Sequence, residues 1–201
     1  MKLNCPIIVI DGITCSGKGI VLQHMAKKFH ALGINGDPIM LKGVSVLQDR
    51  MKRIFGEYPG KEDPLKYLYR NLDCAENIDK RRALFNETRD YIEDQIYNTI
   101  KKSDNGLFIA EWQTSNLFND LWQTAEYRIM IDSDINIRQE RALERGRADD
   151  LAIDNISEIR EKAFRPLLEN AKNIDFAINN NSSIGSLIDS INAICSAIEL
   201  R

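Results

Sequence analysis

The stretch that decides the fold is PIIVIDGITCSGKG, residues 6–19. Its first half, residues 6–10, is a short apolar run that predicts a buried strand. The residues that follow the stretch, 20–32, carry apolar side chains on one face and predict an amphipathic helix that ends at Gly33. A buried strand, a glycine-rich turn and a helix in this order are typical of an α/β protein.

The turn has the spacing GxxxxGK, with Gly12, Gly17 and Lys18 at the defined positions. In such a loop the backbone N–H groups surround a phosphate, and the glycines permit the close approach and the positive φ that this requires. The positive end of the next helix faces the same anion, and the lysine reaches the outer phosphates. We therefore predict a nucleotide-binding loop that comprises Gly12, Thr14, Cys15, Ser16, Gly17, Lys18, Gly19 and Ile20.

The loop departs from its usual pattern at one point. A Ser or Thr normally follows the lysine and binds Mg²⁺, whereas Gly19 and Ile20 occupy the next two positions of this chain. We expect the metal to be held by water, by the triphosphate and by a carboxylate at a strand end. Glu111, which follows another predicted strand, is the candidate.

The rest of the chain alternates short apolar runs with longer amphipathic stretches. Further strands are predicted over 38–41, 107–110, 127–131 and 175–178, and further helices over 44–55, 80–102 and 184–194. Strands that are separated by helices are joined by right-handed crossovers, so we expect a single domain, 1–201, with a five-stranded parallel sheet covered on both faces. Ligands of such sheets bind at the carboxyl ends of the strands.

The composition narrows the classes of partner. The chain has 201 residues, 43% of them hydrophobic, and a net charge of −3, which excludes general disorder and argues against a nucleic acid polymer as partner. No apolar run is long enough for a membrane span and no signal-peptide pattern is visible, so we expect a cytoplasmic protein with no membrane partner. The four cysteines lack CxxC spacing, which favours reduced thiols.

Charged residues near other predicted elements are candidates for acceptor binding. Asp37 and Lys42 flank the second predicted strand, and Lys42 would neutralise an acceptor phosphate. Arg89 lies beside the apolar stripe of the long predicted helix, at the border between core and cleft. An ion pair between Arg89 and Glu93, one turn further on, is the alternative.

An arginine cluster follows the fourth predicted strand. Arg138, Arg141 and Arg145 recur at i, i+3 and i+7 on one helical face, and Arg147 follows shortly after. Arginines stabilise the charge that spreads over a transferring phosphoryl group. We predict a phosphate-clamping lid over about 138–156; surface pairing with the interspersed acidic residues is the alternative.

With these features the chain resembles the nucleoside monophosphate kinase superfamily. The likeness to thymidylate kinases rests on Arg89, on Glu111 with the nearby Ser115, and on the run Arg145-Gly146-Arg147. Their Asp-Arg pair after the third strand is replaced here by Glu111-Trp112. The acceptor-binding candidates are then Asp37, Lys42, Arg89 and Ser115.

Dephospho-coenzyme A kinases resemble the chain in its last third. Residues 175–183 look like their fifth strand and adenine-side loop, and Gln139, Arg141 and Arg145 fit their lid helix. Their Asp-x-Asp after the second strand and their Pro-Leu-Leu after the third have no counterpart here.

The resemblance implies a three-layer α/β/α P-loop kinase fold with an arginine-bearing lid and an acceptor-binding helical region over about 43–102. It also implies ATP as donor, Mg²⁺ as cofactor, and a nucleoside or deoxynucleoside monophosphate as acceptor. The implied catalytic residues are Lys18, Glu111, Arg141, Arg145 and Arg147. A dephospho-coenzyme A kinase is one alternative, and a nucleotide-binding module with little kinase activity is another, because the metal-binding hydroxyl is missing. The long helix is a candidate surface for a homodimer.

Overall fold

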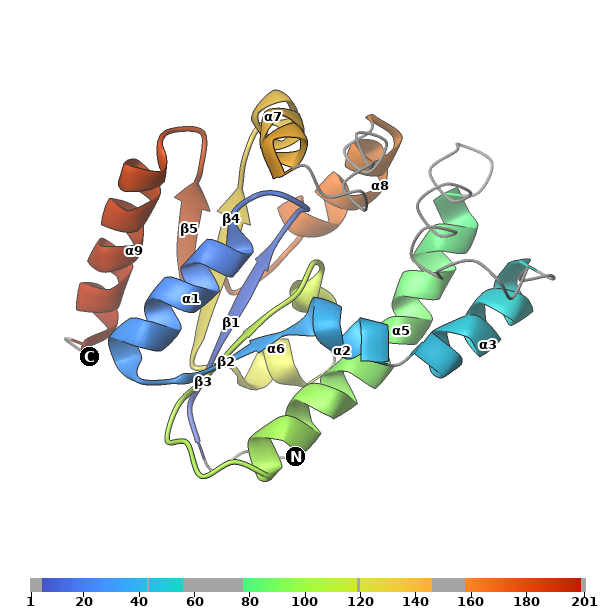
Figure 1. The fold of residues 1–201 in the computed structure, drawn as a ribbon, viewed down its shortest axis with the longest axis horizontal. Helices are drawn as coiled ribbons and strands as arrows, with labels where there is room; N and C mark the ends of the chain where they lie inside the picture. Colours follow the sequence, from blue (N-terminus) through green and yellow to red (C-terminus); the bar gives the residue numbers. More distant parts are fainter. Residues whose placement is uncertain (1–4, 43, 56–77, 119, 146–157, 200–201) are drawn as a thin grey trace.

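The computed structural model describes residues 5–42, 44–55, 78–118, 120–145 and 158–199 (Figure 1). The strands are β1 (Ile7–Gly12), β2 (Leu32–Asn35), β3 (Phe108–Glu111), β4 (Tyr127–Asp132) and β5 (Phe176–Asn179). The helices are α1 (Lys18–Phe29), α2 (Gly36–Lys42), α3 (Val44–Phe55), α5 (Ile78–Lys101), η2 (Ser115–Leu117), α6 (Leu121–Thr124), α7 (Ile135–Arg145), α8 (Glu158–Glu169) and α9 (Ile184–Glu199). In the described part of the chain, none of these helices is long and apolar enough to cross a membrane.

The five strands form one sheet in the order β2-β3-β1-β4-β5, and every neighbouring pair is parallel. β1 is central, with Ile8 opposite Ile109 of β3 on one side and opposite Tyr127 of β4 on the other. All of β1 is buried, which explains why its sequence is apolar without alternation up to Asp11. The prediction of a five-stranded parallel sheet is confirmed. Its strand order reverses at β1, the point where such sheets bind their ligands.

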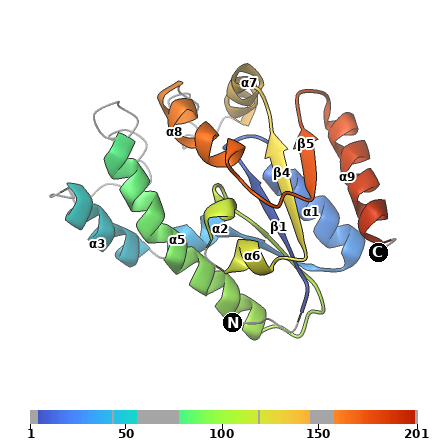
Figure 2. The same cartoon turned by 180° about the vertical axis from the view of Figure 1, so that it is seen from behind.

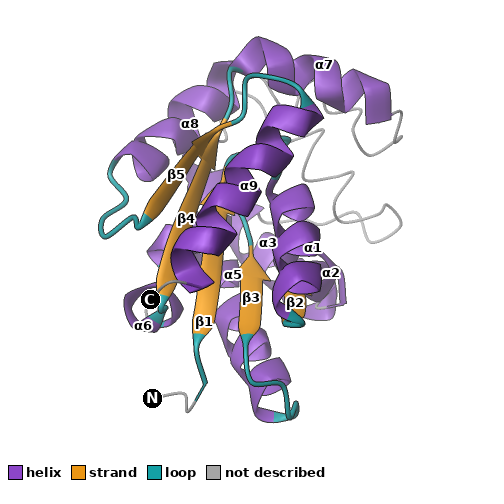
Figure 3. Ribbon diagram, turned by 90° about the vertical axis from the view of Figure 1, so that its left-hand side faces the viewer, coloured by secondary structure: helices purple, strands orange, loops and turns teal. Residues whose placement is uncertain are grey.

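Helices cover both faces of the sheet, as Figures 2 and 3 show from two sides. Ile8 and Ile10 of β1 pack with buried side chains of α1 and α9, whereas Ile7 and Val9 pack with those of α5, α6 and α8. The sheet is therefore the middle of three layers, as predicted. The stripe of α5 around Ile96 lies in the chain's own core, so it gives no reason to expect a second copy of the chain.

The prediction of a strand over residues 38–41 is wrong. Residues 38–41 lie in helix α2, and the strand of that region is β2, Leu32–Asn35. The prediction assigns only Leu32 of this strand to the preceding helix and takes Gly33 as the end of that helix. Helix α1 ends before Gly33 because His30 adopts a left-handed conformation, with φ 52°, and caps the last turn. Pro38 falls in the first turn of α2, where proline is tolerated, and the Asn35 Oδ1 accepts a hydrogen bond from the Asp37 N–H there (2.8 Å).

Candidate active site

The glycines of the phosphate loop are required by close contacts. A Cβ atom on Gly12, whose φ is +155°, would lie 2.3 Å from the backbone oxygen of Ile131 in β4. Gly17, with φ +108°, is the N-cap of α1, and a Cβ there would lie 2.6 Å from Nδ2 of Asn180. The loop thus packs against β4 and against the residues after β5, which fixes its path at the carboxyl end of β1.

The carbonyl oxygens of this loop accept hydrogen bonds from side chains around it. Lys18 Nζ donates to Ile13 O (3.2 Å), Asn180 Nδ2 donates to Ser16 O (2.8 Å), and Arg138 Nη1 donates to Thr14 O (3.4 Å). Backbone carbonyls that turn toward these donors direct their peptide N–H groups the opposite way. Since the first turn of α1 also lacks acidic residues, the loop and the helix together could hold an anion.

The position that lacks the metal-binding hydroxyl is open. A Cβ on Gly19 would meet no atom within 4 Å, so packing does not explain the glycine. The predicted carboxylate, Glu111, is the last residue of β3, is 5% exposed and lies opposite Ile10 of β1. Among the residues that the structure describes, no group of three metal-type side chains forms a site by itself. One carboxylate beside a phosphate loop fits Mg²⁺, which keeps several waters and binds mainly through substrate phosphates.

Asp11, at the end of β1, is fully buried and organises the residues after β3. Its Oδ1 accepts hydrogen bonds from the N–H groups of Gly12 (2.6 Å) and Thr114 (2.8 Å), and its Oδ2 accepts one from Asn116 (2.7 Å). Burial raises the pKa of this carboxyl to about 6, against the opposite effect of these hydrogen bonds and of the Lys18 charge. The sequence places Asp11 at the strand end, yet its partners Thr114 and Asn116 lie 103 and 105 residues away and were not predicted.

The turn after β3 contains residues that pack within the fold, Trp112 and Ser115, and one residue that contacts the phosphate loop, Gln113. The predicted acceptor residue Ser115 is buried, and its hydroxyl donates to Trp112 O (2.8 Å). Trp112 stacks on Phe118, with ring centroids 5.9 Å apart, and packs against Gly36. Gln113, in contrast, accepts a hydrogen bond from the Thr14 hydroxyl (2.8 Å).

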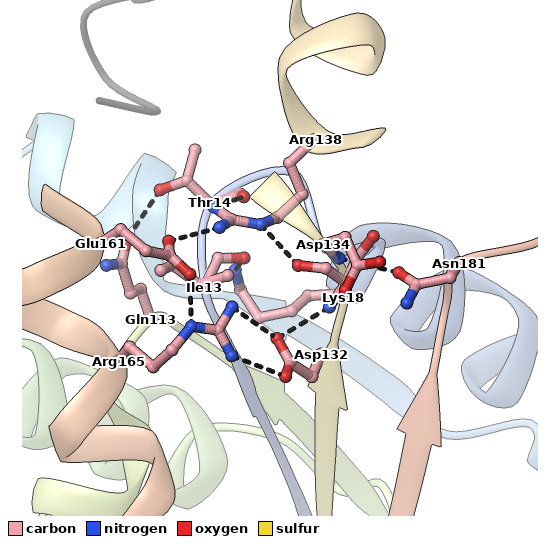
Figure 4. Close-up of polar contacts among 11 residues, drawn as sticks. Ile13, Thr14, Lys18, Gln113, Asp132, Asp134, Arg138, Glu161, Arg165 and Asn181 are labelled. Atoms are coloured by element: carbon pink, nitrogen blue, oxygen red, sulfur yellow. Dashed lines mark hydrogen bonds and ion pairs between the residues drawn. The ribbon is translucent and has the colours of Figure 1, made fainter. Parts of the chain in front are cut away.

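Two arginines that converge near the loop come from α7 and α8 (Figure 4). Arg138 is 1% exposed; its Nε donates to Ser133 O (2.8 Å), and its guanidinium pairs with Glu161. Arg165 pairs with the same Glu161 and, through both Nη atoms, with Asp132 at the end of β4 (2.8 and 3.3 Å). Asp132 and Glu161 therefore join β4, α7 and α8 into one charge network. Arg165 was not predicted, although it stands four residues after Glu161 on one helix face.

The predicted lid arginines have different placements. Arg141 donates from Nη2 to Asn180 O (2.9 Å) and Ser182 O (3.4 Å), so it faces the loop between β5 and α9. The side chain of Arg145, the last residue of α7, lies outside the described residues. So do the whole of Arg147 and all of the predicted lid beyond α7.

The acceptor candidates are not brought together by contacts of the described residues. Asp37 is exposed in the first turn of α2, and the side chain of Lys42, at the end of α2, lies outside the described part. Arg89 pairs with Asp90 (3.1 Å) and not with Glu93. Glu93 instead accepts N–H groups at the start of α6, from Asp120 (2.8 Å) and Leu121 (2.6 Å).

No protein-family model and no curated protein sequence matches the chain. Solved structures resemble it over nearly its whole length. TT1252 from Thermus thermophilus is 19% identical, with a TM-score of 0.66 and 98% of each chain covered. The deoxyadenosine kinase from M. mycoides with bound dATP is 13% identical, with a TM-score of 0.57, and the match covers 96% of this chain and 99% of that one. A dephospho-CoA kinase from Campylobacter jejuni is 16% identical, with a TM-score of 0.54 and 96% of each chain covered. The chain therefore has the fold of the P-loop small-molecule kinases, as its sequence predicts.

Proposed function

We propose that the protein is an ATP-dependent phosphotransferase that moves the γ-phosphoryl group of ATP onto a nucleoside or deoxynucleoside monophosphate. One observation carries the proposal: the GxxxxGK loop lies at the carboxyl end of the central strand, and Arg138 from another helix bonds to its backbone. Phosphoryl transfer needs little covalent chemistry from the protein, and positioning and charge neutralisation supply most of the catalysis.

The donor side consists of the phosphate loop and the start of α1. The loop N–H groups and the N-terminal end of α1 bind the outer phosphates. The Lys18 ammonium group exchanges its hydrogen bond with Ile13 O for a contact with these phosphates, which it makes as a point charge. Mg²⁺, when bound, would neutralise negative charge on the phosphates. Glu111 would hold a water of that ion, because Gly19 offers no hydroxyl.

The charge network of Arg138, Glu161, Arg165 and Asp132 supplies the cations for the transferring group. Arg138 already contacts the loop at Thr14 O, and Arg165 is partly exposed beside it. Both would exchange a carboxylate partner for phosphate oxygens as α7 and α8 close over the substrates, which also keeps water from the reaction. Arg141 would act on the base side of the donor, and Arg145 and Arg147 remain lid predictions.

A second acceptor class also has specific support. The contact between Arg141 and the residues after β5 resembles the adenine-side arrangement expected from dephospho-coenzyme A kinases. Such an enzyme would use the same donor site with a larger acceptor that carries a terminal ribose hydroxyl. The nucleotide-binding module with little kinase activity is the remaining alternative, and it predicts ATP binding without acceptor dependence.

A coupled ADP-release assay tests the proposal. The protein is incubated with ATP and Mg²⁺ against the common nucleoside and deoxynucleoside monophosphates and against dephospho-coenzyme A. Turnover with one monophosphate is expected; turnover with dephospho-coenzyme A alone supports the second class. No acceptor-dependent turnover, with ATP still raising the melting temperature, refutes the kinase assignment.

Lys18→Ala provides the internal test of the donor site. We expect this variant to lose turnover and ATP binding while it keeps its melting temperature. Lys28→Ala is the matched control, because Lys28 is an exposed residue on the same helix and its ammonium group lies 3.9 Å from a carboxylate oxygen of Glu199. Equal turnover in both variants would contradict the assigned role of Lys18.

A further inference from the structure

We propose that the carboxamide of Gln113 contacts the acceptor, by donating a hydrogen bond from Nε2 to an acceptor oxygen beside the transferred phosphoryl group. The inference rests on the proposed phosphoryl transfer and identifies a contact within it. The ligand is an oxygen that accepts hydrogen bonds, on a phosphate or on a hydroxyl group.

The placement of Gln113 links the two substrates. It follows β3 by two residues and is 8% exposed, and its Oε1 accepts a hydrogen bond from Thr14 Oγ1 at 2.8 Å. Thr14 belongs to the phosphate loop, so the carboxamide lies at the edge of the donor site (Figure 4). Gln113 belongs to the turn after β3, on the side of β1 that carries β2 and the helices α2, α3 and α5. The side chain thus lies between the phosphate loop and the acceptor half of the fold.

The second polar atom of this carboxamide lacks a partner. Nε2 of Gln113 is inaccessible to solvent and forms no hydrogen bond within the described structure. A buried donor without a partner destabilises a protein, because it has lost its hydrogen bonds to water without replacement. An acceptor oxygen would satisfy this donor. The negative charge of bound phosphates also favours the amide orientation in which the N–H group, and not Oε1, faces the substrates.

The backbone that presents Gln113 is held in a strained conformation. Thr114, a β-branched residue, has φ +67°, a left-handed conformation that such residues rarely adopt. Strain of this kind is retained where the surroundings impose it. Here the Asp11 carboxylate imposes it, because it binds the N–H groups of Thr114 and Asn116. The central strand therefore sets the turn that holds Gln113 against Thr14.

Steady-state kinetics of Gln113→Glu test the proposal. The variant keeps the size of the side chain and an oxygen for the Thr14 hydroxyl, but it replaces the Nε2 donor with a negatively charged acceptor. We expect the KM for the acceptor to rise at least tenfold while the KM for ATP stays within twofold. Gln123→Glu, which makes the same replacement at an exposed position of α6, should behave like the wild type. An unchanged acceptor KM, or equal increases in both KM values, would overturn the proposal.

The remaining outcomes are also decisive. If Gln113→Glu has a lower melting temperature than the wild type, Thr14→Val serves as the test variant. It removes the hydroxyl that holds the Gln113 carboxamide and adds no charge. An acceptor KM that rises less than threefold in Thr14→Val then overturns the proposal. The KM of Gln113→Glu also identifies the contacted oxygen. A KM that rises for a nucleoside monophosphate but not for its nucleoside assigns the contact to phosphate. A KM that rises for both assigns it to a hydroxyl group. Wild-type protein without acceptor-dependent ADP release refutes the proposed function together with this inference, whereas a normal Gln113→Glu enzyme refutes the inference alone.

Discussion

Gly19 offers a direct test of how the proposed site would bind Mg²⁺. Gly19 is the second residue of α1, and a Cβ there meets no atom within 4 Å. Serine at this position restores the hydroxyl that the phosphate loop lacks, and alanine adds the Cβ alone. Gly19→Ser and Gly19→Ala are therefore a matched pair that separates metal binding from helix stability.

The expected magnitudes follow from this open position. Replacing a helical glycine by alanine stabilises a protein by roughly 0.5–1 kcal/mol when the new side chain fits. For a domain of this size, that corresponds to a rise in melting temperature of about 1–4 °C. The serine hydroxyl can replace one water in the coordination of Mg²⁺. If this contact contributes about 1 kcal/mol, as one net hydrogen bond does, the Mg²⁺ concentration for half-maximal activity falls roughly fivefold.

The measurement is a Mg²⁺ titration of acceptor-dependent ADP release at saturating ATP, with thermal melts of the unliganded variants beside it. Gly19→Ser should need less Mg²⁺ than the wild type, and Gly19→Ala should not. Equal Mg²⁺ dependence in the two variants would refute the reasoning that the missing hydroxyl limits metal binding. If Gly19→Ala melts at a lower temperature than the wild type, the conclusion that a side chain fits at this position is wrong.

Further predictions concern the framework of the site. Gly12→Ala should lower the melting temperature by several degrees, because its Cβ would overlap the Ile131 oxygen and overpacking destabilises by about 1–3 kcal/mol; an unchanged melt would contradict the close contact with β4. Since burial raises the pKa of Asp11 from 3.8 to about 6, the folded protein takes up a proton more readily than the unfolded chain, and the free energy of unfolding should rise by roughly 3 kcal/mol as the pH falls through that window. Urea unfolding of the wild type and of Asp11→Asn at several pH values isolates this contribution, which the variant should lack; parallel pH profiles would count against it. Glu161→Gln should destabilise the protein by roughly 1–3 kcal/mol in the same urea assay, because it leaves the buried guanidinium of Arg138 short of one charged partner; equal stability would show that the charge network contributes little.

The phosphate loop and the central strands could be predicted because their signals are local. Spacing within GxxxxGK fixes the loop by itself, and the unbroken apolar run of β1 reflects burial on both faces of the sheet. β2 was missed because it is four residues long and only Ile34 in it is buried, so it shows neither alternation nor a long apolar run. The cap at Asn35 and the proline at position 38 were the available signals for α2.

The contacts that complete the site could not be predicted from spacing. Thr14 and Gln113 are 99 residues apart, and Asp11 and Asn116 are 105 apart. No periodicity connects such pairs; only the pairing of β1 with β3 brings them together. Two described members of the predicted arginine cluster differ in their contacts: Arg138 donates to the phosphate loop, and Arg141 donates to the residues after β5.

The charge network has a consequence for selectivity. Its two guanidinium groups, on Arg138 and Arg165, are matched by the carboxylates of Glu161 and Asp132, so the cluster is neutral before any substrate arrives. A small free anion such as inorganic phosphate or sulfate gains little there, because it must displace carboxylates that are already well bonded. Only a substrate that is also anchored elsewhere, through the phosphate loop or the acceptor, has enough other contacts to separate these pairs. Under the proposed phosphoryl transfer, the protein without substrates would therefore resist inhibition by simple anions, and both guanidinium groups would stay available for bound substrates.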